Sequence, residues 1–179
     1  MTTNSTINKK RILKNTVYLY LRMLLTIIVG LYASRVLLEK LGFEDYGIYN
    51  VVGGVIILFS FLSAALNSAT QRFLSVELGR NNTERLSKVF GTSIYIYILL
   101  AVMVFVLAET VGLWFLNSQM NFPERRMKAV NWVYQITIIT FILNTLRTPY
   151  NAGIISYERM SFYALTSIFE AVTKLLIIY

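Results

Sequence analysis

The sequence predicts an all-α protein that crosses a membrane several times, and three observations carry that prediction. Of its 179 residues, 56% are hydrophobic and only 15% are charged, against about 25% charged residues in a typical soluble domain. A compact soluble domain of this size could not bury so much apolar surface. Five apolar segments each approach or exceed the roughly 20 residues with which a helix crosses the hydrocarbon core. The two-residue alternation of a membrane β-barrel is missing from them, so we expect helices.

The expected membrane segments are 13–38, 46–66, 89–116, 129–146 and 162–179. We expect the second helix to continue to residue 78 and to stop with Gly79 as its left-handed capping residue, and the fourth to extend to about residue 156. The stretch 39–47, "EKLGFEDYG", predicts a turn, Asn82 an N-cap, and Pro149 a kink or helix end. The chain stops inside an apolar run, which suggests the N-terminal portion of a larger protein.

Composition excludes several kinds of chemistry. The chain has no cysteine and no histidine, which excludes disulfides, thiol chemistry and the catalytic triads and zinc sites built on those side chains. The net charge of +8 is spread between apolar runs, a distribution that fits membrane topology better than a nucleic-acid surface. The first apolar run is too long for a cleaved signal peptide, so we expect it to be retained.

Lysines and arginines at the segment ends predict the orientation. With a cytoplasmic N-terminus, four positive residues lie on the outer side of the membrane, namely Lys40, Arg125, Arg126 and Lys128. Ten then lie on the cytoplasmic side, namely Lys9, Lys10, Arg11, Lys14, Arg72, Arg80, Arg85, Lys88, Arg147 and Arg159. Because positive residues concentrate on the cytoplasmic side, we expect the N-terminus there.

Arg22 is the most informative residue of the first segment. An arginine at the bilayer centre costs roughly 2.5–3.5 kcal/mol on insertion scales. At helical spacing Arg22 shares one face with Asn15, Thr26 and Ala33, opposite an aliphatic face. We therefore expect Arg22 and Thr26 to face protein or a water-filled cavity. Arg35 lies on another face with Glu39 four residues later, which suits a paired interfacial anchor.

The second segment repeats this pattern. Asn50, Ser68 and Arg72 fall near one stripe with several small residues, and we interpret them as candidates that line the same cavity. Small residues also suit simple helix packing, so that interpretation stays open for the glycines of the stripe.

Two further charged positions lie within apolar runs. Glu170 and Lys174 are four residues apart in the fifth segment, so they form either a self-neutralising pair or part of a substrate or proton path. Glu109 lies late in the third segment and is expected at the interface.

The runs "LGFEDYGIYNVVGG" and "PYNAGIISYERMSFYALTSIFEAVTKL" carry a family resemblance. With "LNSATQRFLSVELGR" they resemble the polysaccharide and O-antigen flippases of the multidrug/oligosaccharidyl-lipid/polysaccharide exporter superfamily. The resemblance implies about five helices of the N-terminal bundle of a MATE-like fold, in a multi-pass protein of the bacterial cytoplasmic (inner) membrane.

That resemblance also implies a function. Such proteins move undecaprenyl-diphosphate-linked oligosaccharides by alternating access and are not enzymes. Membrane lipids and polysaccharide assembly proteins are then the expected partners, nucleic acid is not, and no cofactor is expected beyond a coupling ion, H⁺ or Na⁺. Arg22 could offer guanidinium donors to a diphosphate. Two alternatives stay open, a cation-coupled multidrug antiporter and a non-transporting membrane scaffold of a polysaccharide assembly complex.

Overall fold

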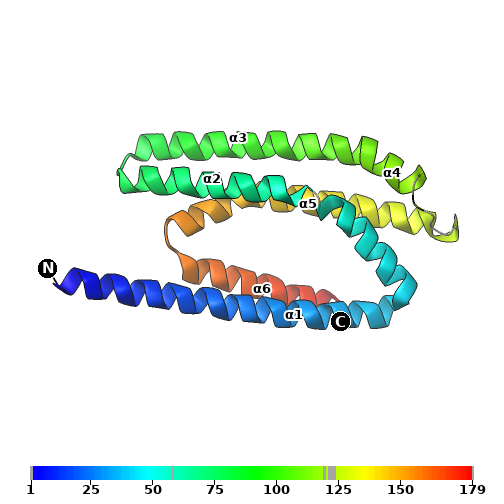
Figure 1. Cartoon of the computed structure of the whole chain (residues 1–179), viewed down its shortest axis with the longest axis horizontal. Coiled ribbons are helices and arrows are strands. Elements are labelled where there is room, and N and C mark those ends of the chain that lie inside the picture. Colours follow the sequence, from blue (N-terminus) through cyan, green and yellow to red (C-terminus); the bar gives the residue numbers. More distant parts are fainter. Residues whose placement is uncertain (1, 58, 119, 121–123, 179) are drawn as a thin grey trace. The chain divides into compact units, whose positions relative to one another are not determined.

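The structure is a computed structural model that describes residues 2–57, 59–118, 120 and 124–178. Every regular element in these residues is a helix, which confirms the all-α prediction. In chain order (Figure 1) the elements are α1 (Thr2–Ile57), α2 (Ser60–Gly79), α3 (Thr83–Leu107), the π-helix η1 (Ala108–Gly112), α4 (Leu113–Ser118), the 3₁₀ turn η2 (Glu124–Arg126), α5 (Met127–Ser156) and α6 (Met160–Ile178).

Helix α1 is interrupted at Gly42, where φ is 77° and ψ is 173°. This backbone region is essentially restricted to glycine, because a Cβ atom would clash there. The interruption falls within the predicted turn 39–47, although Gly47 stays helical. One glycine therefore interrupts the helix.

Four helices in the described part of the chain are long and apolar enough to cross a membrane. They are Asn15–Gly54, Thr83–Ser118, Met127–Ser156 and Met160–Ile178. The first of these helices contains Gly42. It therefore covers most of the expected segment 13–38 and the start of the expected segment 46–66. The expected segment 46–66 is divided, because α1 ends at Ile57 and α2 begins at Ser60.

The end of α2 differs from the prediction in one detail. Its left-handed residue is Asn81 (φ 52°) and not Gly79, which is the last helical residue. The N–H of Asn81 donates to the carbonyl of Leu78 at 3.1 Å, and that of Asn82 to the carbonyl of Glu77 at 3.3 Å. This is the Schellman arrangement. Asparagine can adopt the left-handed conformation that it requires, because its short polar side chain can hydrogen-bond locally there.

Helix α5 does not end at Pro149 but continues to Ser156, about two turns further. Proline has no N–H to donate to the carbonyl four residues earlier, so the helix loses one hydrogen bond there. Pro149 is fully buried and Thr145 is 2% exposed. Packing around this stretch therefore sustains the helix past the proline.

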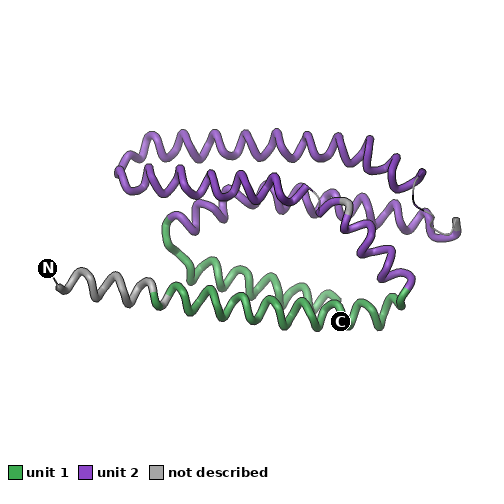
Figure 2. The backbone as a smooth tube through the Cα atoms, viewed as in Figure 1, with its two compact units in different colours: residues 1–43, 157–179 green, residues 44–156 purple. Residues whose placement is uncertain are grey.

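The chain forms two compact units (Figure 2). Unit 1 comprises Met1–Phe43 and Tyr157–Tyr179, and unit 2 comprises Glu44–Ser156. The chain passes between them at two points. Each point lies next to a backbone residue of positive φ, Gly42 at 77° and Glu158 at 55°.

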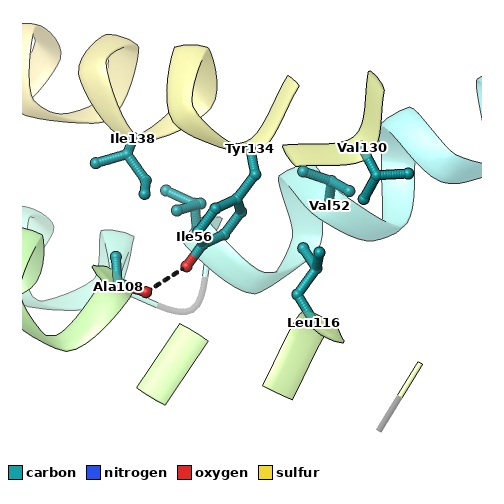
Figure 3. Close-up of a cluster of buried hydrophobic side chains, with 7 residues drawn as sticks. All are labelled: Val52, Ile56, Ala108, Leu116, Val130, Tyr134 and Ile138. Atoms are coloured by element: carbon teal, nitrogen blue, oxygen red, sulfur yellow. Dashed lines mark hydrogen bonds between the residues drawn. The ribbon is translucent and has the colours of Figure 1, made fainter. Parts of the chain in front are cut away.

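The hydrophobic core of unit 2 draws on four elements (Figure 3). Its buried members are Val52, Ile56, Ala108, Leu116, Val130, Tyr134 and Ile138, each at most 3% exposed. In a membrane, lipid is as apolar as the core, so close van der Waals packing and hydrogen bonds between helices hold such a cluster together. This packing fixes the facing surfaces of α1, α4, α5 and the π-helix.

Candidate functional site

Arg22 lies against the ring of Tyr163 within unit 1. The guanidinium carbon is 4.2 Å from the ring centroid, a cation–π geometry worth about 0.5–2 kcal/mol. Its Nε atom is buried and makes no hydrogen bond to a described residue. A guanidinium stacked on a ring keeps its N–H groups at its edge, where they match the oxygens of a phosphate or carboxylate. The pair is therefore an oriented cationic donor inside an apolar segment.

Exposure varies along the rest of that helix face, where Asn15 is half-buried and Thr26 is exposed. Ala33, three turns after Arg22, is 2% exposed. On the opposite side Leu24, Ile28 and Leu31 are each at least 60% exposed. The hydroxyl of Thr26 donates to the carbonyl of Arg22 at 2.8 Å, so this predicted site residue is satisfied within its own helix and keeps only acceptor capacity.

The three candidates in unit 2 are exposed, and two of them bond within their own helix. Asn50 donates to the carbonyl of Tyr46 at 2.9 Å, and Ser68 to that of Ala64 at 3.2 Å. Arg72 is exposed one turn after Ser68. Arg22 and Thr26 belong to unit 1 and these three to unit 2, so the cavity that all five would line remains a prediction.

The remaining charged candidates lie on exposed positions of unit 1. Glu170 and Lys174 of α6 are both exposed, and so are Arg35 and Glu39 of α1. The predicted roles of these two i,i+4 pairs therefore stay predictions.

A second polar cluster, which sequence spacing did not reveal, surrounds the π-helix of unit 2. The amide nitrogen of Gln135 donates to Oε2 of Glu109 at 3.2 Å. One residue earlier on α5, the hydroxyl of Tyr134 donates to the carbonyl of Ala108 at 2.8 Å (Figure 3). π-Helical turns inside α-helices often mark functional sites. Of these residues, only Glu109 could be singled out from the sequence, because it is a charged residue in an apolar run.

Gly112 makes this cluster geometrically feasible. It is buried in the same π-helix, and a Cβ atom on it would collide with the hydroxyl of Tyr134. The missing side chain lets the phenol reach the helix backbone. Gly112 and Tyr134 thus hold the π-turn that presents Glu109 to Gln135.

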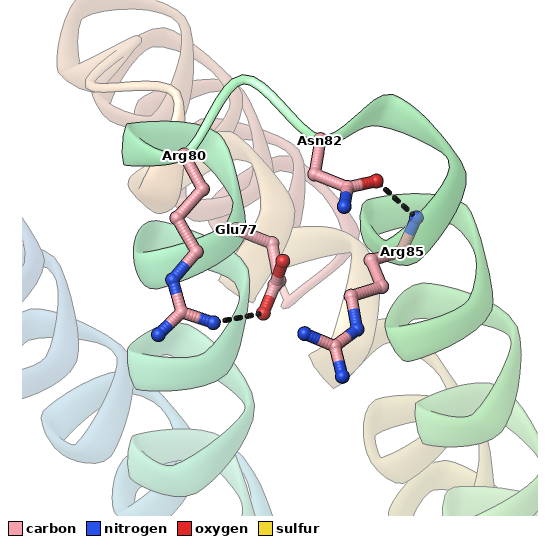
Figure 4. A network of polar contacts seen from close by, with 4 residues as sticks. All are labelled: Glu77, Arg80, Asn82 and Arg85. Carbon is pink, nitrogen blue, oxygen red and sulfur yellow. Dashed lines mark hydrogen bonds and ion pairs between the residues drawn. The ribbon is translucent and has the colours of Figure 1, made fainter.

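Figure 4 shows the polar contacts where α2 and α3 meet. Oδ1 of Asn82 accepts the N–H of Arg85 at 3.0 Å, which confirms the predicted N-cap. Glu77, 8% exposed, pairs with Arg80 at 3.3 Å through one carboxylate oxygen. The other oxygen is buried and has no hydrogen-bond partner among the described residues. These contacts stabilise the hairpin.

Arg126 forms a third charged group in unit 2. It bonds Asp45 and lies 3.5 Å from Glu44, which ties η2 to the start of the unit. Within the described ranges, no three Asp or Glu side chains gather in a way that could hold a metal ion.

Helical architecture and apolar length define a polytopic, all-helical membrane protein. The MatE family model matches residues 12–179, so the chain belongs to the MatE family, whose members are membrane transporters. The chain is similar to the uncharacterized membrane protein EpsK of Bacillus subtilis (strain 168), at 25% identity over 153 residues. That match covers 86% of this chain and 30% of EpsK, so the chain spans about a third of its relative's length. No solved structure matches the chain significantly.

Proposed function

We propose that the protein transports lipid-linked oligosaccharides, the repeat units of a polysaccharide or O-antigen, across the bacterial cytoplasmic membrane by alternating access. MatE membership supports the transporter class. The substrate class rests on Arg22, a cation in an apolar helix, stacked on Tyr163 and with a buried donor that lacks a hydrogen bond. In this proposal the donor groups of Arg22 bind the diphosphate that carries the glycan.

The chemistry of Arg22 favours this cargo over a cationic drug. A buried N–H without a partner costs about 1–3 kcal/mol, and more when the group is charged. A diphosphate oxygen would remove that cost through a charge-assisted hydrogen bond. A cationic drug would instead meet a like charge. In the proposed orientation, with a cytoplasmic N-terminus, the cargo moves toward the periplasmic leaflet.

Complementation of a flippase-null strain by the full-length gene tests the proposal. Arg22→Lys keeps the charge but loses the planar fork, so we expect reduced glycan export. Arg22→Ala should lose more at unchanged membrane abundance, and Tyr163→Leu should resemble Arg22→Lys. Arg35→Ala is the matched control, an exposed arginine on another face of the same helix.

Full complementation by Arg22→Ala at normal abundance would refute diphosphate binding by this residue. Export of cationic dyes by the wild-type protein, without glycan export, would favour the multidrug antiporter instead.

A further inference from the structure

The acidic side chains of unit 2 divide by the kind of partner they have. Four of those the structure describes lie within 4 Å of an arginine or lysine, namely Glu44, Asp45, Glu77 and Glu84. A cationic partner favours the ionised carboxylate. Glu109 differs, because its recorded partner is the neutral amide of Gln135 at 3.2 Å.

Glu109 is also the one charged residue between residues 89 and 118, the apolar part of the candidate span Thr83–Ser118. It is half-buried, and nine residues separate it from Ser118, where the helical stretch ends. That separation corresponds to about 13 Å along a helix, so the carboxyl group lies more than two turns before the end of the candidate span. Ionisable groups in apolar spans are rare and commonly serve as proton or ion sites.

The geometry around Glu109 is fixed by neighbouring groups. The hydroxyl of Tyr134 holds the carbonyl of Ala108, one residue before Glu109. Gly112, three residues after it, leaves room for that hydroxyl. Tyr134 of α5 therefore bonds the π-turn before Glu109 and lies close to it after Glu109, and Gln135 is the next residue on α5.

An amide is a partner that serves both states of a carboxyl group. Its NH₂, which bonds Oε2 of Glu109 in this structure, can donate to an ionised carboxylate, and after rotation its carbonyl oxygen can accept from a protonated one. A lysine or arginine could serve only the ionised state. We propose that Glu109 and Gln135 form a proton-binding site within the membrane, in which Glu109 takes up the proton and Gln135 bonds both forms.

The charged and titratable groups near Glu109 come from the helices joined to the π-helix or packed against it. The helices continuous with the π-helix, α3 and α4, carry no other Asp, Glu, Lys or Arg between residues 89 and 118. From α5 the facing titratable group is Tyr134, whose hydroxyl donates a hydrogen bond to the carbonyl of Ala108. Lys128 is exposed about two turns from Gln135, and Glu44 and Asp45 of α1 are engaged by Arg126. The proposal does not depend on the identity of the cargo.

The test uses dicyclohexylcarbodiimide, an apolar reagent that requires a protonated carboxyl group. The carboxyl transfers its proton to a reagent nitrogen and its oxygen bonds to the central carbon, and the adduct then rearranges to a stable N-acylurea. Membrane vesicles with the full-length protein are treated across a pH series, and modification is read by mass spectrometry of the peptide that contains residue 109. We expect modification of Glu109 that falls about tenfold per pH unit once most of the carboxyl is ionised.

Substitutions of Gln135 sharpen the test. Gln135→Lys supplies a fixed cation and should abolish modification of Glu109, whereas Gln135→Leu keeps the partner site neutral and should retain it. Glu84, exposed and paired with Lys88 at 2.7 Å, is the internal control and should stay unmodified by this reagent. The wild-type pH series stands alone if a variant fails to fold.

Three results would overturn the proposal. The first is no adduct at Glu109 at any pH in intact vesicles, and the second is unchanged modification in a folded Gln135→Lys variant. The third is protection by NaCl but not by KCl at constant pH, which would make this a sodium site. None of these readouts involves glycan export, so failure here is distinct from failure of the proposed function.

Discussion

The two units differ in how their helices are held together. In unit 2, bulky buried side chains such as Tyr97, Leu116, Tyr134 and Ile138 form the interior. In unit 1, the buried hydrophobic residues of the described chain are small or short, namely Ala33, Val36 and Ala164. The larger apolar side chains of α1 are mostly exposed. Unit 2 therefore contains its own core, whereas the apolar surface of unit 1 is suited to lipid or to further helices.

Their polar contacts differ as well. Hydrogen bonds from side chain to backbone join separate elements of unit 2, from Tyr134 to Ala108 and from Ser156 to Gln71 at 3.3 Å. In unit 1, α1 and α6 meet through the stack of Arg22 on Tyr163. The first kind of contact stabilises a scaffold, and the second keeps a charged donor oriented. We therefore expect substitutions in unit 2 to act mainly on stability, and substitutions at the stack of unit 1 mainly on transport.

The largest stability effect is expected for Tyr134→Ala. The side chain is fully buried and bonded to the π-helix, and removing a large aromatic ring from a packed core costs about 3–5 kcal/mol. Unfolding of the purified protein by SDS titration measures the loss. Tyr95→Ala, at a position 76% exposed, is the control and should change the unfolding free energy little. Equal effects would mean that unit 2 has no specific core.

Gly112→Ala should be the next most damaging change. The added methyl group collides with the hydroxyl of Tyr134, and overpacking of this kind costs about 1–3 kcal/mol. Removing that hydroxyl in the double variant Gly112→Ala/Tyr134→Phe should recover part of the loss. A double-mutant cycle on the unfolding free energy measures this coupling. Strict additivity would show that the two residues are not in contact.

A smaller effect is expected at the first crossing between the units. Gly42→Ala forces a Cβ atom into a backbone region restricted to glycine, at about 1–2 kcal/mol. Gly47→Ala is the matched control, since that glycine is helical and nothing lies within 4 Å of its Cβ position. There alanine should stabilise by about 0.5–1 kcal/mol. Thermal unfolding of both variants should give shifts of opposite sign, and shifts of the same sign would contradict the interruption at Gly42.

The smallest effects are expected at the α2–α3 hairpin. Asn82→Ala removes the cap of α3 and should cost about 1 kcal/mol. Lys88→Gln breaks an exposed pair with Glu84 that is worth about 0.3–0.5 kcal/mol. Denaturant titration should rank the two in this order, and the reverse order would argue against the cap.

Local features of the fold could be predicted from the sequence, because hydrophobic length and capping residues act within a few residues. The helices, the interruption near Gly42 and the Asn82 cap are of this kind. The left-handed capping residue after α2 was predicted two residues too early, because glycine is the usual residue in that conformation and here Asn81 adopts it. A helix end was one of the two outcomes predicted for Pro149, and α5 instead continues to Ser156, because tertiary packing outweighs the lost hydrogen bond.

Contacts between helices could not be predicted in the same way. Arg22 stood out as a charge in an apolar run, but its partner Tyr163 lies on α6, at the other end of the chain. Gln135 is 26 residues from Glu109 and looks like an ordinary polar residue. Such pairs depend on which helix faces pack together, and periodicity within one helix carries no information about that.

Binding of the lipid carrier tests the central claim most directly. Purified full-length protein in nanodiscs is titrated with undecaprenyl diphosphate, for the wild type, Arg22→Gln and the control Arg35→Gln. Loss of a charge-assisted hydrogen bond of about 1.5–3 kcal/mol predicts roughly ten- to a hundredfold weaker binding for Arg22→Gln. Arg35→Gln should bind like the wild type. Equal affinity of wild type and Arg22→Gln, with both variants folded, would contradict the assignment of the diphosphate site to unit 1.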